Sequence, residues 1–321
     1  MYKTLKVLGI LILLYILYFQ IIEAKGWVYL QKEFSDSHII IQYKYILFAV
    51  MLMPINWLLE AKKWQILYRN FEKISLKEAF ITVLAGNSLG VVTPARIGEY
   101  GGRLITSHPD HRGGVILATF IGSITQNVWN LFIGLSFSFF LIQDLIGINY
   151  IEQKGFLIIG ILQTLMMTAL LIFLPKILFS IAKTQLFKKS FLGLNNHDLV
   201  SFSSRSIYKS IGWSLVRYII YTIQYALVIM AFNGWSGIET LFSGIALIYF
   251  VQTIIPLPSL VNVVARGEIA IFIWPKLGLS VPVALLSSYT IWLINLIFPA
   301  LIGAIFLYSY STFSKSKSSL E

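Results

Sequence analysis

The sequence predicts an all-α polytopic membrane protein with six membrane spans and two re-entrant hairpins arranged as an inverted repeat. Three observations lead to this prediction. Hydrophobic residues make up 57% of the 321-residue chain and charged residues only 12%, whereas a soluble domain carries about 25% charge. Apolar runs long enough to cross a bilayer, about 20 residues each, recur along the chain. Basic residues gather in short segments between these runs.

Six apolar runs are predicted to span the membrane. They occupy residues 5–22, 43–60, 114–142, 155–174, 208–232 and 282–308. The first run follows two lysines and has some features of a signal peptide. We interpret it as an uncleaved span, because it is long for a signal peptide and no small-residue cleavage site follows it.

The distribution of basic residues predicts the side on which each loop lies. Lysine and arginine are concentrated at the N-terminus, in loops 61–77 and 175–209, and in the tail 311–321, which the positive-inside rule assigns to the cytoplasm. The balanced or acidic loops, assigned to the outside, are 23–42, 143–154 and 233–240. Both termini are therefore expected in the cytoplasm, and the net charge of +11 requires no nucleic acid partner. The expected location is a bacterial inner membrane.

Two segments do not fit as simple crossings. Segment 78–113 begins and ends at cytoplasmic charges, and its apolar part is short and meets Pro94. Segment 240–281 begins and ends outside and is broken by Pro256 and Pro258. Both are predicted to be re-entrant hairpins, because non-helical backbone at membrane depth is tolerated only when it is buried in protein or lines a wet cavity. The alternative is eight simple spans.

The predicted elements form a single transmembrane domain, residues 1–321, with internal symmetry. Each half, about 1–150 and 151–310, contains two spans, a hairpin and a third span. The halves have opposite orientations, which is typical of transporters whose broken elements meet near the midplane of the membrane.

The first hairpin carries the charges that most strongly suggest function. Arg96, Glu99 and Arg103 lie in an otherwise apolar region, where a charge costs about 2.5–3.5 kcal/mol. We predict that they bind substrate, since a guanidinium can hold a phosphate or carboxylate through two hydrogen bonds. Pro94 and Gly98 are predicted hinges, because proline stops a helix and glycine permits a tight return. The alternative is a buried ion pair that only stabilises the hairpin.

The second hairpin repeats this composition. Pro256 and Pro258 are followed by Arg266, Gly267 and Glu268. We predict that the arginine and the glutamate bind substrate and that the prolines and the glycine act as hinges. The alternative is an outside loop whose charges are solvated.

Polar residues in the flanking helices are predicted to complete the site. The substrate-binding candidates among them are Asn87, Gln126, Asn130 and Arg217. Gln126 and Asn130 share a helix face with Ser123 and Asn127. The alternative is that these polar groups join helices to one another. Arg217 is either an anchor that reaches the cytoplasmic interface or a guide for anionic headgroups.

No metal site or cofactor is predicted. Segment 108–112, His-Pro-Asp-His-Arg, is a short loop with no further ligands nearby in the sequence. The chain has no nucleotide-binding loop, nucleophile elbow or zinc-protease motif.

Three motifs resemble the lysylphosphatidylglycerol synthase transmembrane-region family, also called flippase-like domain proteins. They are Asn56-Trp57 through Glu60-Ala61-Lys62-Lys63-Trp64, the run from Gly86-Asn87 to Pro94-x-Arg96-x-Gly98-Glu99 with Arg103, and the stretch from Pro256 to Glu268. The resemblance implies a membrane domain that moves lipids between leaflets. It does not imply lysyl-lipid synthesis, because no soluble synthase domain follows the last span. The second hairpin also lacks the family's glycine pair and has Ser259–Ala265 there.

The expected function is therefore a flippase-like protein that binds or moves a phosphate-bearing lipid headgroup. Its expected partners are anionic or lipid-linked membrane lipids and a separate synthase. Two alternatives stay open. One is an intramembrane transferase or hydrolase with Glu99 or Glu268 as general base, and the other is a membrane partner that recruits a synthase without transport.

Overall fold

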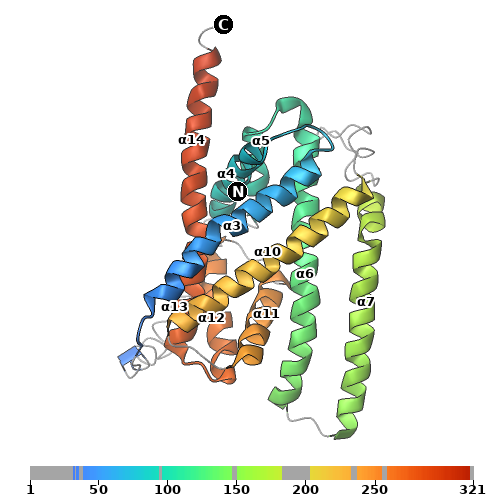
Figure 1. The fold of residues 1–321 in the computed structure, drawn as a ribbon, viewed down its shortest axis with the longest axis vertical. Coiled ribbons are helices and arrows are strands. Elements are labelled where there is room, and N and C mark those ends of the chain that lie inside the picture. Colours follow the sequence, from blue (N-terminus) through green and yellow to red (C-terminus); the bar gives the residue numbers. More distant parts are fainter. Residues whose placement is uncertain are drawn as a thin grey trace, which may run out of the picture.

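The protein is described by a computed structural model that covers residues 32, 34–35, 39–93, 96–146, 150–182, 203–232, 237–254 and 259–318. Every regular element within these residues is a helix, and Figure 1 shows how the helices cross. The predicted first span 5–22 lies outside the described residues, as do the predicted hinges Pro94, Pro256 and Pro258.

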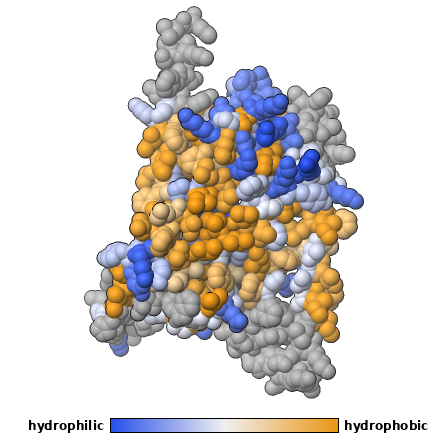
Figure 2. All heavy atoms as spheres, in the orientation of Figure 1, coloured by the Kyte–Doolittle hydropathy of each residue, from blue (hydrophilic) through white to orange (hydrophobic). Residues whose placement is uncertain are grey.

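Five helical segments of the described chain are long and apolar enough to cross a membrane. They lie in α3 (Tyr43–Tyr68), α6 (Arg112–Ile146, extended by η3 in front of it), α7 (Tyr150–Ala182), α10 (Ser204–Ala231), and the pair α13 (Val281–Trp292) and α14 (Phe298–Ser318). Each of them overlaps one of the five predicted spans after the first. Apolar residues form a broad belt across this face of the molecule, and hydrophilic residues gather above the belt (Figure 2). The chain is thus a multi-pass membrane protein.

The prediction that residue 61 begins a loop is wrong. Helix α3 continues to Tyr68, and Lys63 and Trp64 are each only 1% exposed. The reason is that Glu60, Lys63 and Trp64 share the inward face of the helix, three or four residues apart. The loop that follows is correspondingly shorter, from Arg69 to Ser75.

Two pairs of short helices occupy the segments predicted as hairpins. The first pair is α4 (Leu76–Val92) and α5 (Gly98–Ile105), followed by η3 (Pro109–His111), and the second is α11 (Ile238–Ile254) and α12 (Ser259–Ile273), followed by η5 (Pro275–Leu277). Helices α4 and α11 have 17 residues each, fewer than the about 20 residues of a typical membrane-spanning helix. In Figure 1 the first pair lies in the upper part of the molecule and the second in the lower part.

The short helices pack on the long helices of the opposite half of the chain. Helix α4 lies against α14 and α11 lies against α6, while α3 and α10 run side by side and pack extensively at the centre. Glycine makes both of the first two contacts close. A Cβ atom at Gly303 of α14 would meet the carbonyl of Leu84, and one at Gly134 of α6 would meet Phe250. Small residues allow helix backbones to approach in this way inside membranes.

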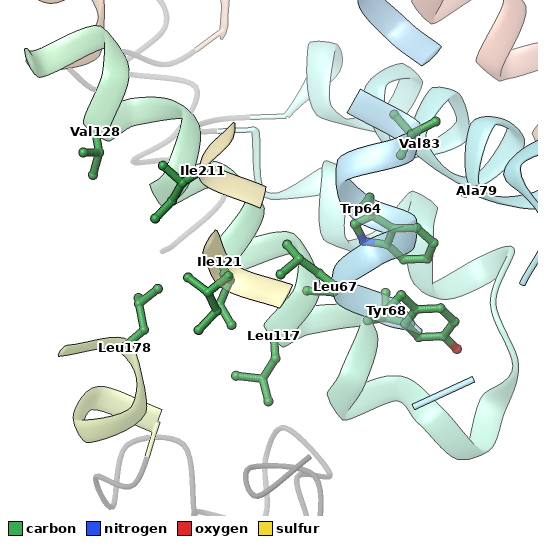
Figure 3. Close-up of a cluster of buried hydrophobic side chains, with 14 of the residues drawn as sticks. Trp64, Leu67, Tyr68, Ala79, Val83, Leu117, Ile121, Val128, Leu178 and Ile211 are labelled. Atoms are coloured by element: carbon green, nitrogen blue, oxygen red, sulfur yellow. The ribbon is translucent and has the colours of Figure 1, made fainter. Parts of the chain in front are cut away.

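Buried apolar side chains form two clusters, and Figure 3 is a close-up of one of them. It joins α3, α4, α6, α7 and α10 through residues that include Trp64, Leu67, Val83, Ile121 and Ile211. The other cluster surrounds Trp274 and joins α10, α11, α12 and α13. Between them lies the polar interior described below.

The start of α4 is fixed by a capping box. Ser75 Oγ accepts a hydrogen bond from the Glu78 backbone N–H at 3.2 Å, and the Ser75 backbone N–H donates to the Glu78 carboxylate at 2.7 Å. These two hydrogen bonds satisfy N–H groups that have no partner within the helix.

Replacing Ser75 with alanine is expected to lower stability by about 1 kcal/mol, measured as a drop in melting temperature in detergent at neutral pH. The bond from the Ser75 backbone N–H lowers the pKa of Glu78. A carboxyl whose pKa is lower in the folded state stabilises the fold above its ordinary pKa of 4.5, and this contribution is lost as the pH falls through the folded value. An unchanged melting temperature for Ser75→Ala at neutral pH would contradict the prediction.

Candidate functional site

A cluster of buried charges surrounds Glu60 of α3. Its carboxylate lies 2.5 Å from Lys63 Nζ, 3.2 Å from Arg217 Nη1 of α10 and 3.4 Å from Arg103 Nη2 of α5. Glu60 is 7% exposed, and Lys63 and Arg103 are each 1% exposed. One carboxylate thus holds together three cations from three helices.

The α4–α5 turn adds a second carboxylate and a fourth cation. Glu99 pairs with Arg103 one helical turn further on, and its other oxygen lies 3.3 Å from Arg96 Nε. Arg96 has φ +57°, a left-handed conformation that is uncommon for residues other than glycine and costs about 1–3 kcal/mol. Its Nη2 donates to Asn87 Oδ1 at 3.0 Å, and its side chain is still 44% exposed. The turn therefore leaves the Arg96 guanidinium accessible, although the backbone conformation of Arg96 is unfavourable.

Glycines explain how α5 comes so close to α4. A Cβ at Gly86 would lie 2.8 Å from Arg103 Cγ, and one at Gly102 would meet the carbonyl of Ala85. A Cβ at Gly98 would meet the carbonyl of Leu89, and the Gly98 N–H donates to Thr93 Oγ1 at 2.7 Å. This close approach brings Arg103 within reach of Glu60.

The described cluster carries more positive than negative charge. Lys63, Arg96, Arg103 and Arg217 face the two carboxylates of Glu60 and Glu99. Because water screens charges poorly in such a place, two uncompensated positive charges favour an anion nearby.

A chain of hydrogen bonds leads from the cluster into the second half of the molecule. Arg217 donates to Asn56 Oδ1 at 3.0 Å and to Gln126 Oε1 at 3.3 Å. Gln126 donates to the Tyr221 hydroxyl at 3.3 Å, Tyr221 donates to Asn130, and Asn130 donates to Thr253 Oγ1 at 3.0 Å. Networks whose members are all satisfied hold their geometry firmly.

A π-helical turn, η6 (Leu293–Ile297), separates α13 from α14 beside this network. Pro299 has no N–H, so it cannot donate to the Asn295 carbonyl four residues earlier. That carbonyl instead accepts from Trp57 Nε1 at 3.2 Å, and the next one, of Leu296, accepts from Asn87 Nδ2 at 3.1 Å. Such turns frequently occur at functional sites.

Two cavities meet at the centre of the polar region. The first, of about 350 Å³, is lined by residues that include Glu60, Lys63, Glu99 and Tyr100. The second, of about 340 Å³, is lined by residues that include Tyr249, Gln252, Arg266 and Trp292. Both are lined by Arg96, Gln126, Asn127 and Arg217. We call them the cluster cavity and the tyrosine cavity.

The structure brings most of the predicted binding residues to these cavities. Arg96, Glu99, Gln126, Asn130, Arg217 and Arg266 line one or both. Asn87 and Arg103 stand behind them, where they hold Arg96 and Glu99 respectively. Arg217 pairs with Glu60 in the charge cluster.

Two predicted residues of the second hairpin lie elsewhere. Glu268 is exposed on α12 and lines neither cavity. Gly267, a predicted hinge, lies inside α12 and is buried, and a Cβ there would lie 2.5 Å from the Tyr289 hydroxyl. This glycine serves close packing between α12 and α13.

Sequence reasoning gave no role to Glu60 and Lys63. Their run, Glu-Ala-Lys-Lys, looks like the start of a charged loop. A signal was available, because Asn56, Glu60 and Lys63 fall on the same helix face as Trp57 and Trp64. A helix that continued past residue 60 with this face inward would have buried the pair.

A family model described as Lysylphosphatidylglycerol synthase TM region matches residues 6–303. No curated protein and no solved structure matches the chain.

Proposed function

The chain belongs to the lysylphosphatidylglycerol synthase transmembrane-region family, and from that membership we propose that it moves a phosphate-bearing lipid headgroup between the two leaflets. The family places it among membrane proteins related to lipid metabolism. The cluster cavity would hold the phosphate while the acyl chains stay in the bilayer.

The observation that carries this proposal is the guanidinium of Arg96. It lines both cavities, is 44% exposed, and stands among more cations than carboxylates. Its strained backbone is held in place by Asn87 and Glu99. An accessible arginine at such a place is suited to bind a phosphate, because the phosphate oxygens can accept two hydrogen bonds from the planar guanidinium.

The packing of the helices supports the inverted repeat as part of this proposal. Each short helix lies against the last long helix of the other half, α4 on α14 and α11 on α6. On this basis α4–α5 and α11–α12 are re-entrant from opposite sides of a bacterial inner membrane, with both termini in the cytoplasm. The Arg96 turn and Arg266 would then meet near the midplane, as in other transporters with broken helices.

The surroundings of the two candidate catalytic bases, Glu99 and Glu268, favour lipid transport over a transferase or hydrolase activity. Both oxygens of Glu99 are engaged by guanidinium groups, so its carboxylate is poorly placed to take a proton. Glu268, the other candidate base, lines neither cavity. A separate synthase would supply or modify the lipid.

Translocation should depend on Arg96. In vesicles reconstituted with the purified protein and fluorescent phosphatidylglycerol, Arg96→Gln is expected to slow transfer between leaflets by about tenfold or more, the value of a charge-assisted hydrogen bond. Transfer is measured as the fraction of label protected from a membrane-impermeant quencher. Arg69→Gln, an exposed arginine at the end of α3, is the matched control.

Two experimental results would overturn the proposal. The first is equal transfer by wild type and Arg96→Gln when both have the same melting temperature in detergent. The second is a new or missing lipid species in extracts of the vesicles, which would point to an enzyme.

A further inference from the structure

We propose that the tyrosine cavity binds the part of the lipid headgroup beyond the phosphate, and that this part is rich in hydroxyl groups and carries no positive charge. A polyol or a sugar ring fits this description. The inference rests on the proposed function and adds the chemical class of the substrate.

The charges of the tyrosine cavity exclude a cationic headgroup. Arg96, Arg217 and Arg266 line it, and its lining includes no Asp or Glu in the part of the chain that the structure describes. An amino or trimethylammonium group would meet three guanidinium groups without a carboxylate to pair with. Its attraction to the rings of Tyr221, Tyr249 and Trp292 would be several-fold weaker than like-charge repulsion at contact distance.

The uncharged polar groups of the cavity are suited to hydroxyl groups. The amides of Asn127 and Gln252 line it, and no hydrogen bond joins either to another residue across the described ranges. An amide both donates and accepts, as a hydroxyl does, so each can bind a hydroxyl of either orientation. Asn127 is exposed and Gln252 is half-buried, so both amides are accessible to a ligand that enters the cavity.

The walls of the cavity are suited to a ring. Tyr249 packs edge-on against Tyr221, with ring centroids 4.6 Å apart, and its hydroxyl donates to the Tyr221 carbonyl at 3.3 Å. Trp292 also lines the cavity. These fixed aromatic surfaces can cover the C–H face of a polyol or sugar ring while the amides bind its edge.

The two cavities divide the headgroup between them. Arg96 and Arg217 line both, so a phosphate held by these two arginines has the charged cluster on one side and the amides on the other. A phosphodiester therefore directs its polar substituent toward Gln252 and Asn127.

The test measures binding by the purified full chain in detergent, without transport. Short-chain phosphatidylinositol, phosphatidylglycerol, phosphatidic acid and phosphatidylcholine are titrated, and affinity is obtained from the rise in melting temperature. We expect the inositol lipid to bind most tightly, the glycerol lipid next, phosphatidic acid about five- to tenfold more weakly than the inositol lipid, and phosphatidylcholine most weakly.

Two variants locate the preference. Gln252→Leu and Asn127→Leu are each expected to weaken binding of phosphatidylinositol about fivefold, the loss of one neutral hydrogen bond, and to leave phosphatidic acid unchanged. Gln163→Leu, on α7 away from both cavities, is the matched control and should alter neither lipid.

Equal affinity for phosphatidylinositol and phosphatidic acid, or tightest binding of phosphatidylcholine, would overturn the inference. Failure of the proposed function would look different. If the protein preferred hydroxyl-rich lipids through Gln252 but moved no lipid between leaflets, the proposed transport would be rejected and the inferred substrate class would be retained. If the protein moved anionic lipids between leaflets without such a preference, transport would be retained and the inferred substrate class would be rejected.

Discussion

Replacing Glu60 with glutamine is expected to lower stability by about 3–5 kcal/mol, which is the cost of removing one partner from a buried ion pair. Glu60 is the carboxylate that Lys63, Arg103 and Arg217 share, and the first two are almost fully buried. Without it these cations lie close together, and Glu99 is the one carboxylate left to pair with them among the described residues. The change should therefore destabilise the packing of α3 against α5 and α10.

The measurement is the melting temperature of the purified protein in detergent. Glu72→Gln is the matched control, because Glu72 lies past the end of α3 and accepts one hydrogen bond from Tyr68 at 2.8 Å. Combining Glu60→Gln with Lys63→Met should recover part of the loss, since it removes one of the stranded charges. If Glu60→Gln melted at the same temperature as Glu72→Gln, the charge cluster would not stabilise the fold.

Replacing Gly303 with alanine is expected to cost about 1–3 kcal/mol or more, as other overpacked sites do. The added Cβ would meet the backbone carbonyl of Leu84 in α4, and a backbone carbonyl cannot swing aside as a side chain does. Helix α14 would have to move away from α4. Gly134→Ala should have a comparable effect where α6 meets α11, because the added atom would meet Phe250 and the carbonyl of Ala246.

Gly212→Ala in α10 is the control for both glycines. Nothing lies within 4 Å of a Cβ at that position, and alanine is favoured over glycine inside a helix by about 1 kcal/mol. The control should therefore melt at the same temperature as wild type or higher, and Gly303→Ala and Gly134→Ala lower. Three similar melting temperatures would show that these contacts between the halves are not close.

The helices that cross the bilayer could be predicted from the sequence because they depend on local composition. A span needs only a long apolar run, and runs such as 208–232 and 282–308 are unmistakable. The end of α4 at Val92 was also predictable, since a proline two residues later cannot continue the helix. The hairpin charges Arg96, Glu99 and Arg103 were predictable because they interrupt apolar sequence.

The rest of the site depends on contacts between distant parts of the chain. Glu60 and Arg217 are paired, yet neither residue's neighbours in the sequence indicate the other. Whether a charge at the end of an apolar run lies in water or in a cluster is decided by the helices packed around it. The tyrosine cavity was harder still, because Tyr249 and Gln252 lie in a short helix that is apolar over most of its length.

The π-helical turn at Leu293–Ile297 also sets the rotational phase of the last helix. An α-helix advances about 100° per residue, and a π-turn accommodates one extra residue, so everything after it is rotated relative to what comes before. Trp292 can thus face the tyrosine cavity while Gly303 faces α4. The number of residues between these two positions is therefore constrained more tightly than their identity, and this stretch should tolerate conservative substitutions far better than a single insertion or deletion.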